Sequence, residues 1–188
     1  MLILITGGSK NGKSSIAEKI ITSYNSKRFY IATMIPFGEE AFEAIERHRK
    51  IRLNKHFETI EKYTDIQEID IDNNSSVLLE CIGNLCANEM FENKIEKPTD
   101  KILSGILKIN SRAEVFVIVT NQVGEDGIEY PKDTMNYIKN IGEINKKISK
   151  KADCVIEAVY GIPIVLKGDR LLYQPKSIIQ GELPPCLL

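Results

Sequence analysis

Short apolar runs alternate along the chain with longer stretches in which apolar residues recur at helical spacing. The runs at 2–6 (LILIT) and 114–120 (EVFVIVT) are typical of strands that are buried in a parallel sheet. The alternation predicts an α/β fold with a mostly parallel sheet and helices on both faces. We expect further strands at 28–33, 57–61, 76–82 and 153–160, and helices at 14–24, 39–53, from the end of the 76–82 strand to about Phe91, at 99–111 and at 133–150.

The end of the chain departs from this alternation. Residues 162–167 and 170–174 flank Gly168-Asp169, which predicts a closing antiparallel hairpin. The last stretch, which ends at residue 188, has no clear period. We therefore expect one domain over residues 1–167, followed by a hairpin strand and a tail at 168–188 without an assigned role.

Length and charge narrow the class of protein. A chain of 188 residues fits one domain. Its formal net charge of -1 argues against a dedicated nucleic-acid binder, because such proteins usually carry a strong basic excess. No apolar run approaches the roughly 20 residues that cross a bilayer. The N-terminal run also lacks the basic segment of a signal peptide, so we read it as a strand.

The cysteines indicate a reducing compartment. They form no C-x-x-C pair, and a disulfide framework would normally occupy a shorter chain. A zinc site would need distant partners, so small buried apolar side chains are the favoured interpretation. We expect a cytoplasmic protein with free thiols at Cys81, Cys86, Cys154 and Cys186.

One segment carries a specific motif. Residues 7–14 (GGSKNGKS) fit G-x-x-x-x-G-K-[ST], directly after a predicted strand and at the start of a predicted helix. Glycines let the backbone N–H groups approach phosphate oxygens, and the helix N-terminus adds a positive partial charge. Lys13 is expected to reach the β- and γ-phosphates, and the Ser14 hydroxyl to bind Mg²⁺. The motif predicts a nucleotide but not a reaction.

Glu80 is the candidate for a second metal ligand. It ends the apolar run 77–79, and ligands of parallel α/β sheets bind at the carboxyl ends of the strands. Asp153 begins its strand and is therefore expected at the opposite edge. The alternative for Glu80 is a carboxylate that merely meets solvent.

The segment 39–55 (EEAFEAIERHRKIRLNK) is acidic in its first half and basic in its second. This order complements the helix dipole, so a solvated surface helix explains it well. The cations around His48 would also attract a phosphate-bearing ligand and lower the pKa of the imidazole. A neutral imidazole nitrogen can attack an α-phosphate and form a phosphoramidate. Both interpretations stay open on the residues alone.

Several segments together resemble a known family. They are GGSKNGKS at 7–14, YIAT at 30–33, RHRKIR at 47–52 followed by FETIE at 57–61, LLEC at 78–81 and TNQVG at 120–124. The chain from about residue 2 to Lys167 resembles the bifunctional adenosylcobinamide kinase / adenosylcobinamide-phosphate guanylyltransferase family of cobalamin biosynthesis. The resemblance implies a P-loop α/β domain that phosphorylates adenosylcobinamide with a nucleoside triphosphate. It then implies transfer of GMP from GTP to adenosylcobinamide phosphate, which gives adenosylcobinamide-GDP.

The resemblance also implies roles for single residues. His48 matches the family's guanylylated histidine because it directly precedes the basic R-x-x-R stretch. Family members form trimers, which implies a homo-oligomer. The implied substrates are ATP and GTP with Mg²⁺. The residues implied to bind the nucleotide are Gly7, Gly8, Ser9, Lys10, Asn11, Gly12, Lys13, Ser14, Ala32, Thr33, Met34, Arg49, Lys50, Ile51, Arg52, Glu61 and Glu80.

Three parts of the chain depart from the family pattern. Gln122 stands where the family usually has the glutamate of T-N-E-V-G. Residues 124–131 replace the usual G-x-G-I-V-P-x-N continuation. Ile138 and Glu143 stand where the later helix normally carries arginines. These departures concern substrate handling more than the fold or nucleotide binding.

Two other functions remain as alternatives. The first is a single-activity small-molecule or nucleotide kinase that uses Lys13 and Ser14 but keeps His48 only as a structural residue. The second is a nucleotide-gated switch or a recombinase-like ATPase core that binds a macromolecule. The balanced charge and the lack of an extended basic stripe count against the second.

Overall fold

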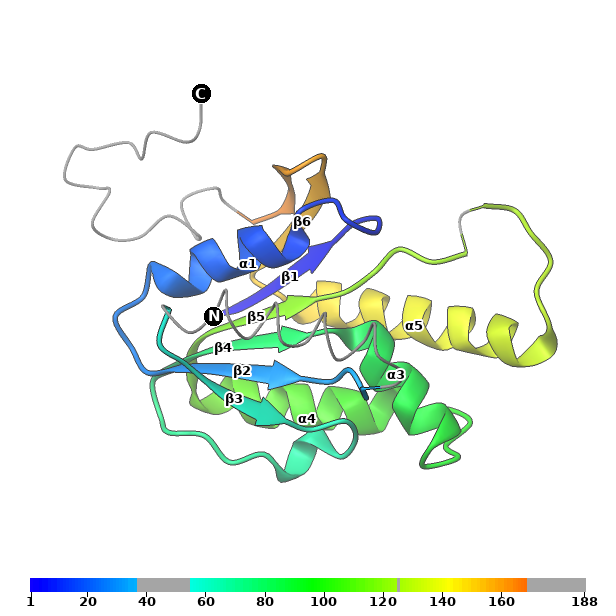
Figure 1. Ribbon diagram of the computed structural model, residues 1–188, viewed down its shortest axis with the longest axis horizontal. Helices are drawn as coiled ribbons and strands as arrows, with labels where there is room; N and C mark the ends of the chain where they lie inside the picture. Colours follow the sequence, from blue (N-terminus) through cyan, green and yellow to red (C-terminus); the bar gives the residue numbers. More distant parts are fainter. Residues whose placement is uncertain (37–54, 125, 169–188) are drawn as a thin grey trace.

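The structure is a computed structural model that describes residues 1–36, 55–124 and 126–168 (Figure 1). It contains a seven-stranded sheet in the order β3-β2-β4-β5-β1-β6-β7. The strands are β1 (Leu2–Thr6), β2 (Arg28–Ala32), β3 (Phe57–Glu61), β4 (Ser75–Glu80), β5 (Ala113–Val119), β6 (Cys154–Val159) and β7 (Ile162–Lys167). The helices are α1 (Lys13–Thr22), α3 (Ile82–Phe91), α4 (Thr99–Arg112) and α5 (Lys132–Lys151), with a 3₁₀ turn η1 (Ile66–Glu68).

The sheet confirms the predicted α/β class. The pairings from β3 across to β6 are parallel, and β7 alone among the described strands runs antiparallel to its neighbour. The antiparallel hairpin turns at Tyr160 and Gly161, so the partner of 162–167 in the structure is β6. The partner that the sequence predicted for 162–167, residues 170–174, lies outside the described residues, as does the helix predicted at 39–53.

One predicted boundary is wrong. The apolar run 76–82 suggests a strand that continues through Ile82, but β4 ends at Glu80 and α3 begins at Ile82. Cys81 occupies the junction between them. The run is mostly apolar because both the strand and the start of the helix bury their apolar side chains in the two core clusters of the protein. Hydrophobicity by itself therefore does not mark where the strand stops.

The sheet is buried on both faces. Alternate residues of each central strand point to opposite sides. In β1, Ile3 and Ile5 pack with α1 on one face, whereas Leu2 and Leu4 pack with α3, α4 and α5 on the other (Figure 1). This double coverage explains why the central strands lack the polar alternation of a half-exposed sheet.

The described cysteines confirm the sequence interpretation. Cys81, Cys86 and Cys154 are free and buried. Burial raises the pKa of the Cys86 thiol to about 12, so this thiol is protonated at neutral pH.

Within residues 1–36, 55–124 and 126–168, no group of three or more His, Cys, Asp or Glu side chains is placed to hold a metal ion. In the same part of the chain, no helix is both long and apolar enough to cross a membrane.

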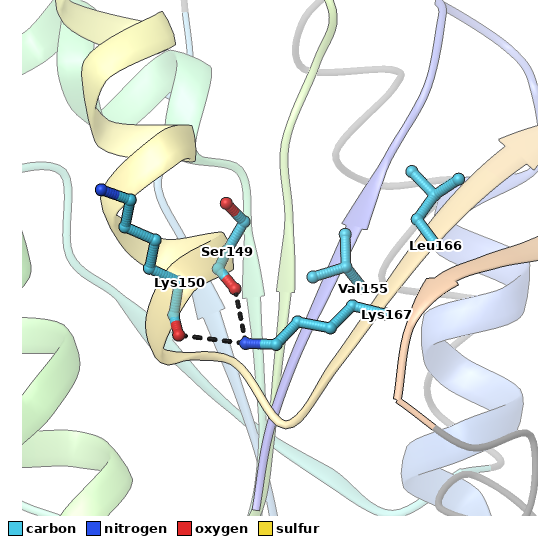
Figure 2. Close-up of a pocket in the computed structure, with 5 residues that line it drawn as sticks. All are labelled: Ser149, Lys150, Val155, Leu166 and Lys167. Carbon is cyan, nitrogen blue, oxygen red and sulfur yellow. Dashed lines mark hydrogen bonds between the residues drawn. The ribbon is translucent and has the colours of Figure 1, made fainter.

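A single lysine ties the hairpin to α5. The Lys167 ammonium donates to the carbonyl oxygens of Ser149 and Lys150, both at 3.0 Å (Figure 2). It also donates to the carbonyl oxygen of Ala152 at 2.7 Å. A cation there satisfies carbonyls at the helix C-terminus and complements its dipole. The pocket in Figure 2 is lined by Ser149, Lys150, Val155, Leu166 and Lys167. Because Val155 is the second residue of β6, this pocket lies near the amino edge of the parallel strands.

A buried ionic network fixes the segment after β3. Glu89 on α3 is 1% exposed and accepts hydrogen bonds from the backbone N–H of Asp65 at 2.8 Å and from Asn93 at 2.8 Å. The Lys101 ammonium on α4 lies 2.6 Å from carboxylate oxygens of both Glu89 and Asp65. Its hydrogen bond is the main reason why the pKa of Asp65 is held well below the usual range. The network joins three segments through one lysine.

Removal of this lysine should leave the buried Glu89 carboxylate without its cation. We expect Lys101→Met to lower the free energy of unfolding by about 2 kcal/mol, which is below the usual loss for a broken buried pair because Lys101 is partly exposed. The measurement is urea denaturation at pH 7. Lys147→Met is the matched control, since Lys147 also contacts two carboxylates, Asp100 and Glu143, but on the surface. An equal shift of the midpoint in both variants would contradict the prediction.

Candidate nucleotide-binding site

The motif at Gly7–Ser14 forms the connection from β1 to α1, beyond the arrowhead of β1 in Figure 1. Gly7 has a φ of 142° and Gly12, the residue before α1, a φ of 85°. Side chains rarely tolerate such angles, which explains glycine at both positions. Helical bonding begins within the motif, because the Ile16 N–H donates to the Gly12 carbonyl at 3.0 Å. The loop therefore delivers its free N–H groups at a helix N-terminus, where phosphate binds well.

The turn between β6 and β7 supports this loop from one side. A β-carbon on Gly7 would lie 2.6 Å from the Ala158 carbonyl oxygen, and one on Gly12 would lie 3.0 Å from Cα of Gly161. The Gly161 N–H also donates to the carbonyl of Asn11 at 3.1 Å. Glycine is thus required at position 7 for space as well as for backbone conformation.

Lys13 lies inside the loop. It is 7% exposed, and its ammonium donates to the carbonyl oxygens of Gly7 at 2.9 Å and Gly8 at 2.6 Å. Burial lowers the pKa of Lys13, although the nearby Cys81 and Glu80 act in the opposite direction. The cation is therefore held by backbone dipoles at the position where a phosphate would approach the loop.

The carboxylate of Glu80 meets the start of α1. Ser14 Oγ donates to one carboxylate oxygen, and the Tyr30 hydroxyl donates to the other at 3.0 Å. Glu80 is the last residue of β4, at the carboxyl edge of the parallel strands, as its sequence position predicts. Asp153 lies at the opposite edge, where it accepts a hydrogen bond from the Leu2 N–H at 2.7 Å. The structure therefore brings Ser14 and Glu80 together.

The carboxyl ends of β2 and β3 complete this edge. Ala32 pairs in register with Glu80 on one side and with Glu61 on the other. The Tyr63 hydroxyl donates to the Glu61 carboxylate at 3.1 Å. Met34 is 36% exposed just beyond β2. The predicted residues at positions 32, 34, 61 and 80 thus share one edge of the sheet with the phosphate loop.

Thr33 uses its polar groups within the fold. It is fully buried, its hydroxyl donates to the Cys81 carbonyl at 2.8 Å, and the same oxygen accepts from the Cys81 N–H at 2.7 Å. Its N–H donates to the Glu80 carbonyl at 3.1 Å. The side-chain amide of Asn88 donates hydrogen bonds to the carbonyl oxygens of Thr33 at 2.7 Å and of Tyr63 at 2.9 Å. These bonds fix the ends of β2 and β4 relative to each other.

Part of the predicted site lies outside the described residues. This holds for the candidate nucleophile His48 and for the basic residues and apolar neighbour that follow it, namely Arg49, Lys50, Ile51 and Arg52. The described part of the site comprises the phosphate loop and the strand ends. Their proposed roles remain predictions.

Sequence reasoning missed two polar side chains at this edge. Tyr30 belongs to the YIAT segment, and the period of 2 in a strand places it on the same face as Ala32 and the Glu80 side chain, so the signal was present. Asn88 gave no signal, because a polar residue within a helix is ordinarily solvated. Its bonds depend on the tertiary packing of α3.

A phosphate loop between the first strand and helix, with a carboxylate two strands away that reaches the loop's serine, defines a P-loop α/β nucleotide-binding protein. A family model described as cobinamide kinase / cobinamide phosphate guanyltransferase matches residues 3–166. The chain therefore belongs to this family, whose members are kinases and guanylyltransferases.

Curated relatives agree with this membership. The bifunctional adenosylcobalamin biosynthesis protein CobU of Escherichia coli (strain K12) is 30% identical over 183 residues, which cover 89% of this chain and 100% of the relative. The protein of the same name from Salmonella typhimurium is 28% identical with the same coverage. A solved ATPase from the type III secretion system of pathogenic bacteria aligns with a TM-score of 0.48 and 15% identity, over 92% of this chain and 57% of that chain. This last likeness does not bear on function.

The contact between the loop and β6 can be tested. We expect Gly7→Ala to lower the free energy of unfolding by about 2 kcal/mol, because the added carbon meets a backbone oxygen at a positive φ. The measurement is thermal unfolding. Gly142→Ala in α5 is the control: nothing lies near its β-carbon position, and alanine is the better helix residue. Unchanged stability of Gly7→Ala would show that the loop does not press against β6.

Proposed function

We propose that the protein phosphorylates adenosylcobinamide and then transfers GMP from GTP to adenosylcobinamide phosphate through a guanylyl-histidine at His48. The observation that carries the kinase half is the loop in which Lys13 is buried against the Gly7 and Gly8 carbonyls while Ser14 meets Glu80. Family membership and the names of the curated relatives support both reactions and their corrinoid substrate.

The phosphate loop would hold the triphosphate of ATP or GTP. Its backbone N–H groups and the N-terminus of α1 supply hydrogen bonds and positive partial charge to the phosphate oxygens. The Lys13 ammonium, which donates to two backbone carbonyls, would exchange them for phosphate oxygens. Such positioning, with electrostatic stabilisation, supplies most of the catalysis of phosphoryl transfer.

Ser14 and Glu80 would hold Mg²⁺. A hydroxyl and a carboxylate in direct contact offer the oxygen ligands that this ion prefers, and Mg²⁺ usually retains water in its other positions. When bound, the ion neutralises charge that develops on the phosphates. The Tyr30 hydroxyl keeps the second Glu80 oxygen oriented, so the carboxylate does not rotate freely.

His48 would carry the guanylyl group. A neutral imidazole nitrogen attacks the α-phosphorus of GTP, the bond to the bridging oxygen breaks, and pyrophosphate leaves. The phosphate of adenosylcobinamide phosphate then displaces the imidazole. We assign Ala32, Thr33, Met34, Glu61 and the residues 49–52 to the surroundings of this nucleotide, as the family resemblance implies. The trimer and the cytoplasmic location also remain predictions.

Covalent labelling separates this function from the single-activity kinase. We expect wild-type protein incubated with [α-³²P]GTP to acquire acid-labile label, and protein incubated with [γ-³²P]GTP to acquire none at the same residue. His48→Ala should lose the label and keep phosphorylation of adenosylcobinamide. His56→Ala is the matched control, because the chain contains only these two histidines.

The kinase half is tested on the same preparation. Lys13→Met should lower phosphorylation of adenosylcobinamide by two orders of magnitude or more, because one cation on the transferred phosphate is lost.

Wild-type protein that phosphorylates adenosylcobinamide but takes no label would support the single-activity kinase. Steep loss of DNA or RNA binding with salt would instead point to the macromolecule-binding ATPase.

A further inference from the structure

A second carboxylate lies beside the phosphate loop, away from Glu80. Glu157 is half-buried near the carboxyl end of β6, where it pairs in register with Thr6 of β1. The side-chain amide of Gln122, on the segment after β5, donates to one of its carboxylate oxygens at 2.9 Å. Two strands that flank β1 therefore contribute one polar pair at the carboxyl edge of the sheet.

This pair connects directly to the loop. The backbone N–H of Gln122 donates to the carbonyl of Gly7 at 3.4 Å, and the same carbonyl accepts from the Lys13 ammonium at 2.9 Å. The residue after Glu157, Ala158, presents its own carbonyl to Gly7. Gln122 and Glu157 are thus fixed by backbone contacts to the first residue of the motif, and the amide of Gln122 orients the carboxylate.

The pair also makes sense of a departure in the sequence. The motif T-N-E-V-G would place a carboxylate at position 122, where this chain has Gln122. Two facing carboxylates in this place would repel each other, whereas Gln122 and Glu157 form a hydrogen bond. The chain therefore keeps one carboxylate in this pair, and β6 supplies it in place of the segment after β5.

We propose that Glu157 is the general base of the kinase step, which rests on the proposed function. The hydroxyl oxygen of the acceptor attacks the γ-phosphorus of the nucleotide, and the bond from that phosphorus to the β,γ-bridging oxygen breaks. The nucleoside diphosphate leaves with the electron pair of that bond. The hydroxyl proton passes to the Glu157 carboxylate and from there to water. A positioned carboxylate performs this task in other phosphoryl-transfer enzymes.

Glu80 is less suited to this role. Both of its carboxylate oxygens already accept hydrogen bonds, from Ser14 and from Tyr30. In the proposed function this carboxylate also holds Mg²⁺ together with Ser14, which leaves it less free to accept a proton from the acceptor. On Glu157 the neutral amide of Gln122 donates to one oxygen, and the side chain is only half-buried.

The experiment exchanges the two side chains. Glu157→Gln keeps the size and a hydrogen bond to position 122, and we expect it to lower kcat for phosphorylation of adenosylcobinamide about 100-fold, as for loss of a general base. The double variant Gln122→Glu/Glu157→Gln returns one carboxylate to the pair, and we expect kcat within about 10-fold of wild type. Labelling of Glu157→Gln by [α-³²P]GTP should persist, because guanylylation of an imidazole removes no hydroxyl proton.

Controls separate a chemical role from a structural one. Glu114→Gln is the matched variant, an exposed glutamate on β5 at the opposite edge of the sheet, and should retain wild-type kcat. Thermal unfolding and ATP affinity of Glu157→Gln should equal those of wild type. Wild-type activity in Glu157→Gln, or a double variant as slow as the single one, would overturn the inference. A wild-type protein that phosphorylates no adenosylcobinamide would instead refute the proposed function itself.

Discussion

The close packing of Gly7 against β6 is the constraint on which the site depends. A β-carbon at this residue would meet the Ala158 carbonyl oxygen, while the Gly7 carbonyl itself accepts hydrogen bonds from Lys13 and from the Gln122 backbone. Gly7 therefore contacts the lysine of the loop, β6 and the segment after β5 at the same time. This arrangement fixes the backbone of the loop around the lysine, so that a phosphate would need to order little of the loop when it binds.

Successive side chains of a strand point to opposite faces of the sheet, and this places the polar groups near Gly7 on two different faces. Glu80 and Tyr30 lie on the α1 face, where the serine that opens α1 reaches them. Glu157 has the same parity as Val155, which packs on the face of α3, α4 and α5. The parallel sheet thus separates two carboxylates to opposite faces of one edge. Each has its own hydrogen-bond donors, and their negative charges are not brought together.

Much of this was predictable from the sequence, for identifiable reasons. The motif at 7–14 is recognisable from its glycines, its lysine and its place between a strand and a helix. The position of Glu80 follows from the rule that ligands bind at the carboxyl ends of parallel strands. The bond from Asn88 to two strand ends and the pairing of Gln122 with Glu157 were not predictable, because each joins segments that are 25 or more residues apart. The end of β4 was also misplaced, since burial continues unchanged into α3.

Three long-range contacts that the sequence did not reveal act at strand ends or on the segments that follow them. The Glu89 network holds the segment after β3, Asn88 holds the ends of β2 and that segment together, and Lys167 holds the hairpin against α5. Each uses a side chain to satisfy backbone groups where regular structure stops, because such groups are costly when buried without partners. The hydrophobic pattern determines which strands form and which faces are covered. The polar contacts then determine where the strand ends lie, and the positions of those ends define the site.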